Sequence, residues 1–215
     1  SYLAGIDGIL YGDTPEEGYV RGNTFLHPKL GVAFTVPEGF MIDNSAAAVT
    51  ATGPGDMAVR FDGVALDKNR TLTDYVRSGW VAGLDDTSVH EETINGNDAA
   101  VAKASADGWR FDITVIRAGD QVYRLLTAAP AASTSLDTVA RSVSGSFRIL
   151  SAEEKAALRP LRIRVVTVKP GQTMGSLAAQ MVGVDRKLDL FKVLNAIGPA
   201  GNISAGDKVK IVTDR

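Results

Sequence analysis

The sequence predicts an α+β protein, in which an antiparallel sheet with packed helices fills the first 150 residues and a small strand–helix–helix–strand unit follows. Short segments alternate apolar and polar residues and are separated by Gly, Pro, Asn and Asp, which is typical of half-buried strands joined by tight turns. A few stretches instead repeat apolar residues at helical spacing. After residue 161 the pattern changes to strand, two helices and strand.

Residues 1–23 form an N-terminal segment that precedes the sheet. Its apolar residues are spaced as on one face of a short helix: Tyr2, Leu3, Ile6, Ile9 and Leu10. Residues 12–18 are rich in Gly, Pro and acid, which is typical of a loop. The chain starts with Ser1 and has no signal-peptide pattern, so we expect a fragment or processed form of a longer protein, although an added serine explains Ser1 equally well.

Residues 24–150 contain the expected strands and helices of the first domain. We expect strands over residues 25–26, 30–36, 47–52, 57–66, 88–93, 99–106, 109–117 and 121–128, and helices over residues 72–84 and 136–147. Asn95-Gly96 and Asp107-Gly108 predict hairpin turns, because these residues tolerate positive φ. Each helix has one apolar stripe and must therefore cover a face of the sheet.

A linker over residues 151–161 separates two domains. Ser151 and Glu154 form a capping box that opens a short helix, and Pro160 ends it. Residues 1–161 carry fourteen Lys/Arg and twenty-one Asp/Glu, whereas residues 162–215 carry nine and four. The basic residues are dispersed, so we expect no nucleic-acid binding and interpret the difference as two differently charged solvated surfaces.

The composition is that of a globular chain and excludes several kinds of site. The 215 residues are 45% hydrophobic and 22% charged, which argues against disorder. No apolar run approaches the roughly 18 residues of a membrane helix, so we expect no membrane span. Cysteine is absent, which excludes thiol nucleophiles, cysteine zinc sites and disulfides.

Residues 162–215 carry the most specific pattern in the chain. A strand over residues 162–168 leads into a turn over residues 169–173 that ends in a helix N-cap, and a final turn and strand follow at residues 206–212. The pattern resembles the LysM family, and the matching residues are Val168, Gly171, Gln172, Thr173, Met174, Leu177, Ala178, Leu194, Asn195, Ile203, Gly206, Asp207, Val209 and Ile211. The resemblance implies a βααβ fold with antiparallel strands and both helices on one side.

LysM modules bind polymers that contain N-acetylglucosamine, such as peptidoglycan. The resemblance implies a groove between the loops at residues 171–174 and 197–203, with these candidate binding residues: Gly171, Gln172, Thr173, Met174, Asn195, Ile197, Asn202 and Ile203. The alternative is that Gly171 and Thr173 only shape the turn and cap the helix. Two departures from the family are a longer stretch between the helices and a second loop without an aromatic or a charge.

Two wider resemblances cover the rest of the chain. Residues 24–40, the Asn95-Gly96 hairpin and residues 146–148 resemble PsbP-like domains, which implies an αβα sandwich. Residues 2–13, 25–28 and 146–150, followed by the LysM-like end, look like the C-terminal region of bacterial HtpX-type zinc metallopeptidases of the cell envelope. Members of that family carry an HExxH helix ahead of this region.

The HtpX-type resemblance implies a non-catalytic region that binds and positions. We expect a periplasmic or envelope location, with peptidoglycan, an envelope protein or the peptidase domain of the same chain as partner. Zinc is expected only in that peptidase domain, and no cofactor in this chain. The alternatives are a free-standing envelope protein that holds a small apolar ligand or a protein partner in the PsbP-like domain, and a cryptic hydrolase.

The residues themselves give no catalytic pattern. In the near miss at residues 90–94, Ile94 stands where a second zinc-binding histidine one helical turn after His90 would lie, and His27 precedes a proline in a turn. The acidic pairs at residues 85–86 and 91–92 lie on or near turns, as solvated acids do. We expect Trp80 and Trp109 in the core, and a cleft lined by both and by Phe61 would favour the ligand-binding alternative.

Overall fold

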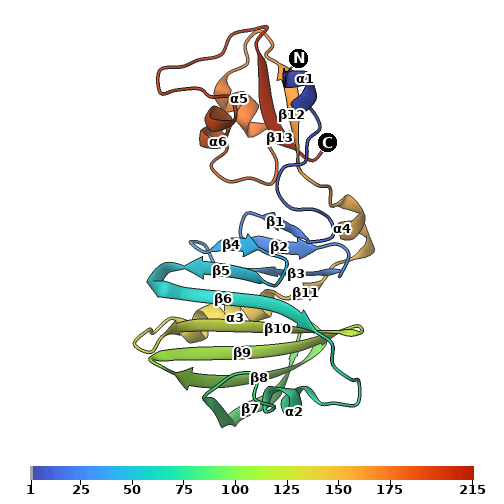
Figure 1. Ribbon diagram of the computed structural model, residues 1–215, viewed down its shortest axis with the longest axis vertical. Helices are drawn as coiled ribbons and strands as arrows, with labels where there is room; N and C mark the ends of the chain where they lie inside the picture. The colour runs from blue at the N-terminus through green and yellow to red at the C-terminus, as the bar shows by residue number, and fades with distance from the viewer. Residues whose placement is uncertain (1) are drawn as a thin grey trace.

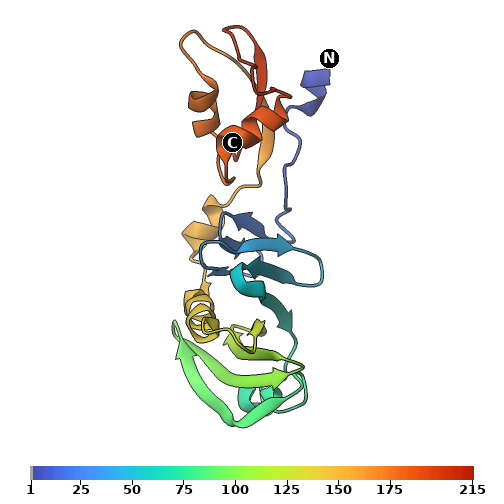
Figure 2. The same ribbon diagram turned by 90° about the vertical axis from the view of Figure 1, so that its left-hand side faces the viewer.

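The computed structural model describes residues 2–215 and shows an elongated molecule with two packed regions (Figure 1). The sheet domain, residues 19–150, holds two antiparallel sheets, and the C-terminal unit, residues 161–215, holds a two-stranded antiparallel sheet. The view turned by 90° shows the same separation (Figure 2). The α+β class with antiparallel sheets is therefore confirmed, whereas Ser1 lies outside the described residues.

The larger sheet has seven antiparallel strands in the order β4-β5-β6-β10-β9-β8-β7. Its strands are β4 (Met41–Asn44), β5 (Val49–Gly53), β6 (Met57–Val64), β7 (Leu84–Ile94), β8 (Asn97–Ala106), β9 (Trp109–Ala118) and β10 (Gln121–Pro130), and a short 3-10 turn η1 (Pro54–Asp56) joins β5 to β6. Asn95 and Gly96 have φ of 47° and 81°, and Asp107 and Gly108 have φ of 52° and 81°. The two predicted hairpins are thus confirmed.

The smaller sheet covers one face of the larger one. Its strands, in the order β1-β2-β3-β11, are β1 (Tyr19–Arg21), β2 (Thr24–His27), β3 (Val32–Thr35) and β11 (Arg148–Ile149). Aromatic rings fill the space between the sheets, with Phe61 at 4.7 Å from Phe34 and stacked on Tyr123 at 5.5 Å between ring centres. The helix α3 (Leu136–Ser146) contacts β3, β9 and β10 and buries Leu136 and Val143 in the same core.

The opposite face of the larger sheet is covered by α2 (Leu72–Val76) and the loop after it. Buried alanines of β8 allow this close approach: Ala100, Ala102 and Ala104. The helix predicted over residues 72–84 is wrong beyond Val76. Gly79 and Gly83 have φ of 93° and 72°, which an α-helix does not contain.

The two tryptophans have different environments. Trp80 packs against this second core, and the Arg124 guanidinium lies 4.5 Å from its ring centre. Arg124 also donates to both carboxylate oxygens of Asp62, at 2.7 and 2.6 Å. Trp109 is 38% exposed, so its predicted core position is wrong. It directly follows the hairpin turn and pairs with Pro130 at the end of the sheet.

The C-terminal unit contains β12 (Arg162–Thr167), α5 (Met174–Ala179), α6 (Lys187–Leu194) and β13 (Lys208–Thr213). The two strands pair antiparallel over their whole length. Its core is a separate cluster of buried residues: Leu161, Val168, Leu177, Ala178, Met181, Phe191, Val209, Ile211 and Val212. Among the described residues, no helix of either region is long and apolar enough to cross a membrane.

The N-terminal segment lies against the C-terminal unit rather than against the sheet that follows it in sequence (Figure 1). The helix α1 (Tyr2–Ile6) is shorter than predicted, because Gly8 has φ of 85°. Residues 8–11 then pair with the chain at β12. Gly8 N donates to Ile163 O at 2.8 Å, Ile163 N to Ile9 O at 2.9 Å, and Tyr11 N to Leu161 O at 2.8 Å.

The chain therefore crosses between the two regions twice, through residues 12–18 and through the linker that holds α4 (Ala152–Ala157). The predicted capping box is present, with Glu154 N donating to Ser151 Oγ at 3.1 Å and Ser151 N to Glu154 Oε2 at 2.9 Å. Arg21 of β1 donates to Arg159 O at 2.8 Å and lies against Gly183 of the C-terminal unit. These contacts join the two regions.

Candidate functional site

The two loops that the sequence assigns to glycan binding meet at one end of the β12–β13 sheet, where the first begins after β12 and the second leads into β13. Val168 N donates to Asp207 O at 2.8 Å, and Gly206 N donates to Val168 O at 2.8 Å. These bonds hold the start of the β12–α5 loop beside the end of the α6–β13 loop. Residues 171–174 and 197–203 therefore belong to neighbouring loops.

The first loop is shaped by hydrogen bonds within four residues. Gly171 has φ of 84°, and Lys169 N donates to Gln172 Oε1 at 2.8 Å. Thr173 caps α5, because Ser176 N donates to its Oγ1 at 3.0 Å while Thr173 N donates to Ser176 Oγ at 2.8 Å. The turn and cap role of Gly171 and Thr173 is thus present in the structure. Gln172 uses its side-chain oxygen in this turn, and no hydrogen bond from its amide NH2 is present among residues 2–215.

The second loop has a similar local character. Ile203 N donates to Asn202 Oδ1 at 2.9 Å. This bond uses the side-chain oxygen of Asn202 and sets the orientation of its NH2 group. Met174, Ile197 and Ile203 are half-buried and pack against the core of the C-terminal unit. The apolar candidates therefore anchor the loops to this core, and only part of each side chain is exposed to solvent.

Asn195 has a structural role that the sequence did not indicate. Lys210 N donates to Asn195 Oδ1 at 2.6 Å, and Asn195 Nδ2 donates to Lys210 O and Phe191 O, each at 2.9 Å. The side chain thus joins the end of α6 to the middle of β13. These bonds use both amide hydrogens and one of the two lone pairs of the oxygen, so the side chain positions the second loop.

A cavity lies between the two sheets of the sheet domain and was missed by sequence reasoning. It is a cavity of about 460 Å³, with Phe25, His27, Phe61 and Tyr123 among its lining residues. Leu30 N donates to His27 Nδ1 at 3.1 Å, and burial lowers the pKa of His27, so the imidazole is neutral near pH 7. Such a site depends on residues far apart in sequence.

The cleft that would have favoured an apolar ligand does not form from the residues named for it. Phe61 belongs to the core between the sheets, Trp80 packs on the opposite face of the larger sheet, and Trp109 lies at its end.

His90 lies near several carboxylates on the exposed edge of the larger sheet. Its Nε2 is 2.8 Å from Glu92 Oε1, and Lys103 Nζ is 2.9 Å from Asp137 Oδ1. Burial raises the pKa of Asp112 to about 6, with Lys103 opposing this shift and Asp137 adding to it. The cavities nearby are lined by Glu92 or by Asp137 and not by His90 or Asp112. Within residues 2–215, no group of three or more His, Asp or Glu could hold a metal ion.

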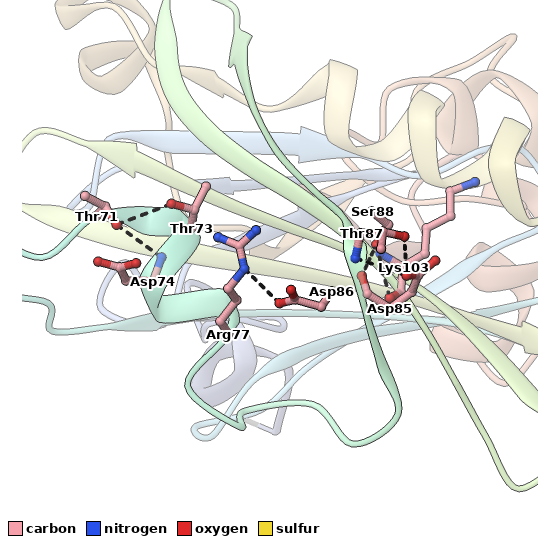
Figure 3. A network of polar contacts seen from close by, with 9 residues as sticks. All are labelled: Thr71, Thr73, Asp74, Arg77, Asp85, Asp86, Thr87, Ser88 and Lys103. Carbon is pink, nitrogen blue, oxygen red and sulfur yellow. Dashed lines mark hydrogen bonds and ion pairs between the residues drawn. The ribbon is translucent and has the colours of Figure 1, made fainter.

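The acidic pair at residues 85–86 has structural contacts (Figure 3). Asp86 Oδ1 accepts from Arg77 Nε at 2.8 Å, and Asp85 Oδ1 accepts from Thr87 N at 3.1 Å and Oγ1 at 2.7 Å. The pairing of β7 with β8 shifts in register between Asp85 and His90. The hydrogen bonds of Asp85 and Asp86 therefore lie at a bulge in this edge strand. Bulges interrupt the exposed ladder of an edge.

No protein-family model matches this sequence, and no curated protein does. Solved structures that are similar include a crystal structure from Bacteroides thetaiotaomicron, which aligns over 70% of this chain and 55% of its own length with 11% identity and a TM-score of 0.47. They also include the solution structure of cyanobacterial PsbP (CyanoP) from Synechocystis sp., which aligns over 64% of this chain and 98% of its own, with 15% identity and a TM-score of 0.45. The part matched in this chain thus spans about half of the Bacteroides protein, and TM-scores below 0.5 assign no function.

Proposed function

We propose that this chain is a non-catalytic binding and positioning region of an HtpX-type zinc metallopeptidase of the cell envelope. In this proposal the sheet domain is PsbP-like, and the C-terminal unit is a LysM-like module that holds peptidoglycan. The observation that carries it is the pair of neighbouring loops, held together by the backbone bonds between Val168, Gly206 and Asp207.

The polar groups of these loops suit a neutral sugar. Gln172 and Asn202 each use the carbonyl oxygen to shape their own loop, which fixes the direction of the amide NH2. An uncharged donor can bind a hydroxyl or acetamido oxygen without the cost of desolvating a charge. Sugar sites of this kind are shallow, so one unit should bind weakly, with a dissociation constant on the order of tens of micromolar to millimolar.

The proposed setting follows from the same resemblance. The module would act in the periplasm or at the envelope, with peptidoglycan or an envelope protein as partner. The peptidase domain of the same chain would hold the zinc ion. The sheet domain would contact that domain or a partner, and this region itself would have no enzymatic activity.

The alternative is a free-standing envelope protein whose sheet domain binds a small molecule. The cavity of about 460 Å³ between the two sheets favours it. The two functions use different surfaces, so each can be tested while the other is left intact.

The test of the glycan site is a pull-down of the full chain with purified peptidoglycan. The Gln172→Glu plus Asn202→Asp variant keeps both carbonyl-type acceptors that shape the loops and removes both NH2 donors. We expect it to lose at least about tenfold in binding, because two hydrogen bonds of roughly 1 kcal/mol each are removed. The melting temperature should stay unchanged.

The matched control is Gln180→Glu plus Asn69→Asp, which makes the same change in charge at exposed positions outside the loops. Equal loss in both variants would show that the basic surface, which includes Lys169, Lys208 and Lys210, attracts the polymer by charge alone. No binding by the unmodified chain at low salt would remove the glycan proposal.

A further inference from the structure

The Arg21 side chain joins the sheet domain to the linker. Arg21 is the last residue of β1, which lies at the end of the sheet domain that faces the C-terminal unit (Figure 1). Its guanidinium lies 4.6 Å from the centre of the Tyr19 ring. It also donates from Nη2 to Arg159 O of the linker at 2.8 Å and from Nη1 to Val20 O at 3.2 Å. The ring and the two carbonyl oxygens together fix the position of this planar cation.

The C-terminal unit meets Arg21 with the loop between α5 and α6. A Cβ at Gly183 in this loop would lie 2.7 Å from Arg21 Cδ, 3.0 Å from its Nε and 3.3 Å from Leu161 Cδ1, so a side chain larger than glycine would clash. Gly183 also has φ of 68°, in the region that favours glycine. A Cβ at Gly22, the next residue after Arg21, would lie 3.8 Å from Asp185 Oδ1 of the same loop. The turn after β1 therefore packs directly against this loop.

Two carboxylates from other segments act on the same guanidinium. Burial lowers the pKa of Arg21, and Tyr19, Asp214 and Asp13 oppose this shift. Asp214 directly follows β13, and Asp13 belongs to the first crossing between the regions. Asp13 Oδ2 also accepts from Val20 N at 3.2 Å, which ties that crossing to β1. Segments of both regions and of both crossings therefore converge on one half-buried cation.

We propose that Arg21 is a latch that holds the sheet domain and the C-terminal unit at one fixed angle. Among residues 2–215, no side chain belongs to the core clusters of both regions, and domains without a large apolar interface usually move relative to each other. Without the latch, the regions would turn about residues 12–18 and 151–161, which are the two crossings. The loop that receives Arg21, residues 182–187, is also the stretch that is longer than in the LysM pattern. The latch does not depend on glycan binding, because none of these contacts involves the glycan loops.

The first test measures the orientation of each region by NMR. Residual dipolar couplings of the backbone amides, recorded on the full chain in a dilute alignment medium, give one alignment tensor for each region. We expect a single tensor to fit both regions of the unchanged chain. In Arg21→Ala, motion between the regions should make the two tensors differ in magnitude by about twofold. Two different tensors in the unchanged chain, or one shared tensor in Arg21→Ala, would overturn the latch.

Gly183→Ala tests the contact from the side of the C-terminal unit. The added methyl group would displace Arg21, so we expect the two tensors to differ as they do in Arg21→Ala. The matched control is Gly55→Ala, because Gly55 has a similar φ of 72° but a Cβ there would meet nothing within 4 Å. The control should keep one shared tensor. If Gly183→Ala also keeps one, the contact between Gly183 and Arg21 does not hold the angle.

Arg21→Lys separates the shape of the guanidinium from its charge. Lysine keeps the charge but lacks the planar fork that contacts the Tyr19 ring and two carbonyl oxygens at once. We therefore expect two tensors in Arg21→Lys, and one shared tensor in the control Arg60→Lys, at an arginine of β6 that pairs with Asp62 within its own strand. One shared tensor in Arg21→Lys would show that charge alone holds the regions and would overturn the assigned geometry. The amide shifts of β9 and β13 should be unchanged in all variants, since both cores stay folded.

Discussion

The sheet domain and the C-terminal unit differ in how each completes its core. The sheet domain buries two clusters on the two faces of one sheet and encloses a group of stacked aromatic rings. The C-terminal unit has helices of six and eight residues and one small cluster, and it takes its edge cover from residues 2–11. A unit of this size buries a smaller fraction of its surface, so it gains from a borrowed segment.

This comparison also explains how the regions are joined. Residues 2–11 belong to the C-terminal unit in space although 150 residues of chain separate them from β12. Paired edges are less exposed to other chains than open ones. The chain leaves the C-terminal unit through residues 12–18 and returns to it through residues 151–161. The sheet domain is therefore inserted, in sequence, between two segments that pack together.

The largest expected effect separates the two cores. Phe61→Ala and Phe191→Ala each remove a buried ring, of 4% and 0% exposure, and should each lower the free energy of unfolding of their own region by about 3–5 kcal/mol. Both tryptophans lie in the sheet domain, so tryptophan fluorescence in urea reports only that region. We expect Phe61→Ala to shift this transition and Phe191→Ala to leave it unchanged. Equal shifts would mean that the two regions unfold as one.

Removal of residues 1–11 should destabilise the C-terminal unit alone. Three backbone hydrogen bonds to residues 161–163 are lost, which at roughly 1 kcal/mol each gives about 3 kcal/mol. Hydrogen exchange of the β12 amides should become faster, with no change in the fluorescence transition.

A related experiment keeps the chain complete. A single protease cut within residues 151–161 should leave both pieces together in native chromatography, because residues 8–11 still pair with residues 161–163. Separation of the pieces after that cut would show that this pairing is too weak to hold the unit.

Asp112 should make the stability of the sheet domain fall as the pH rises. Its pKa in the folded state is about 6, above its ordinary value of 3.8, so the folded state binds more protons between these values. Stability is then greatest below pH 4 for this group and is lost as the pH rises through 6. Asp112→Asn should remove this dependence and stabilise the domain at pH 7.5 by on the order of 2 kcal/mol. The free energy of unfolding in urea is measured at pH 4.5 and 7.5 for the original chain and for Asp112→Asn. If the difference between the two pH values is the same in both proteins, the prediction is wrong.

The smallest effect concerns the linker, which belongs to neither core. Ser151→Ala removes the Oγ that accepts from Glu154 N, keeps the backbone N–H that donates to Glu154 Oε2, and should cost about 1 kcal/mol of local helix stability. We expect faster proteolysis within residues 151–158 and no shift in the transition of either region. A clear shift in one of them would assign α4 to that region.

Some elements follow from local chemistry and could be predicted. The hairpin turns at Asn95 and Asp107 need only residues that accept positive φ. Strands with long alternation, such as β8 and β9, were placed to within about two residues. The strands β1, β4 and β11 were missed, because segments of three, four and two residues carry too little periodicity.

The candidate sites divide in the same way. Thr173 was predicted as a cap because a cap bond joins residues three positions apart. The bonds between Asn195 and Lys210 of β13 could not be predicted, because the two residues are fifteen positions apart. The cavity between the two sheets could not be predicted, since its lining residues lie far apart in the sequence, from Glu16 to Tyr123.

The sequence by itself determined the turns, the caps and the period of each long strand, because φ preferences and hydrogen bonds within four residues set them. The tertiary structure alone decided that Gly8 to Tyr11 pair with the chain around β12, and that a cavity lies between the two sheets of the sheet domain. These features bring together residues up to 155 positions apart. They arise when packing and strand register bring distant groups together, which no local pattern encodes.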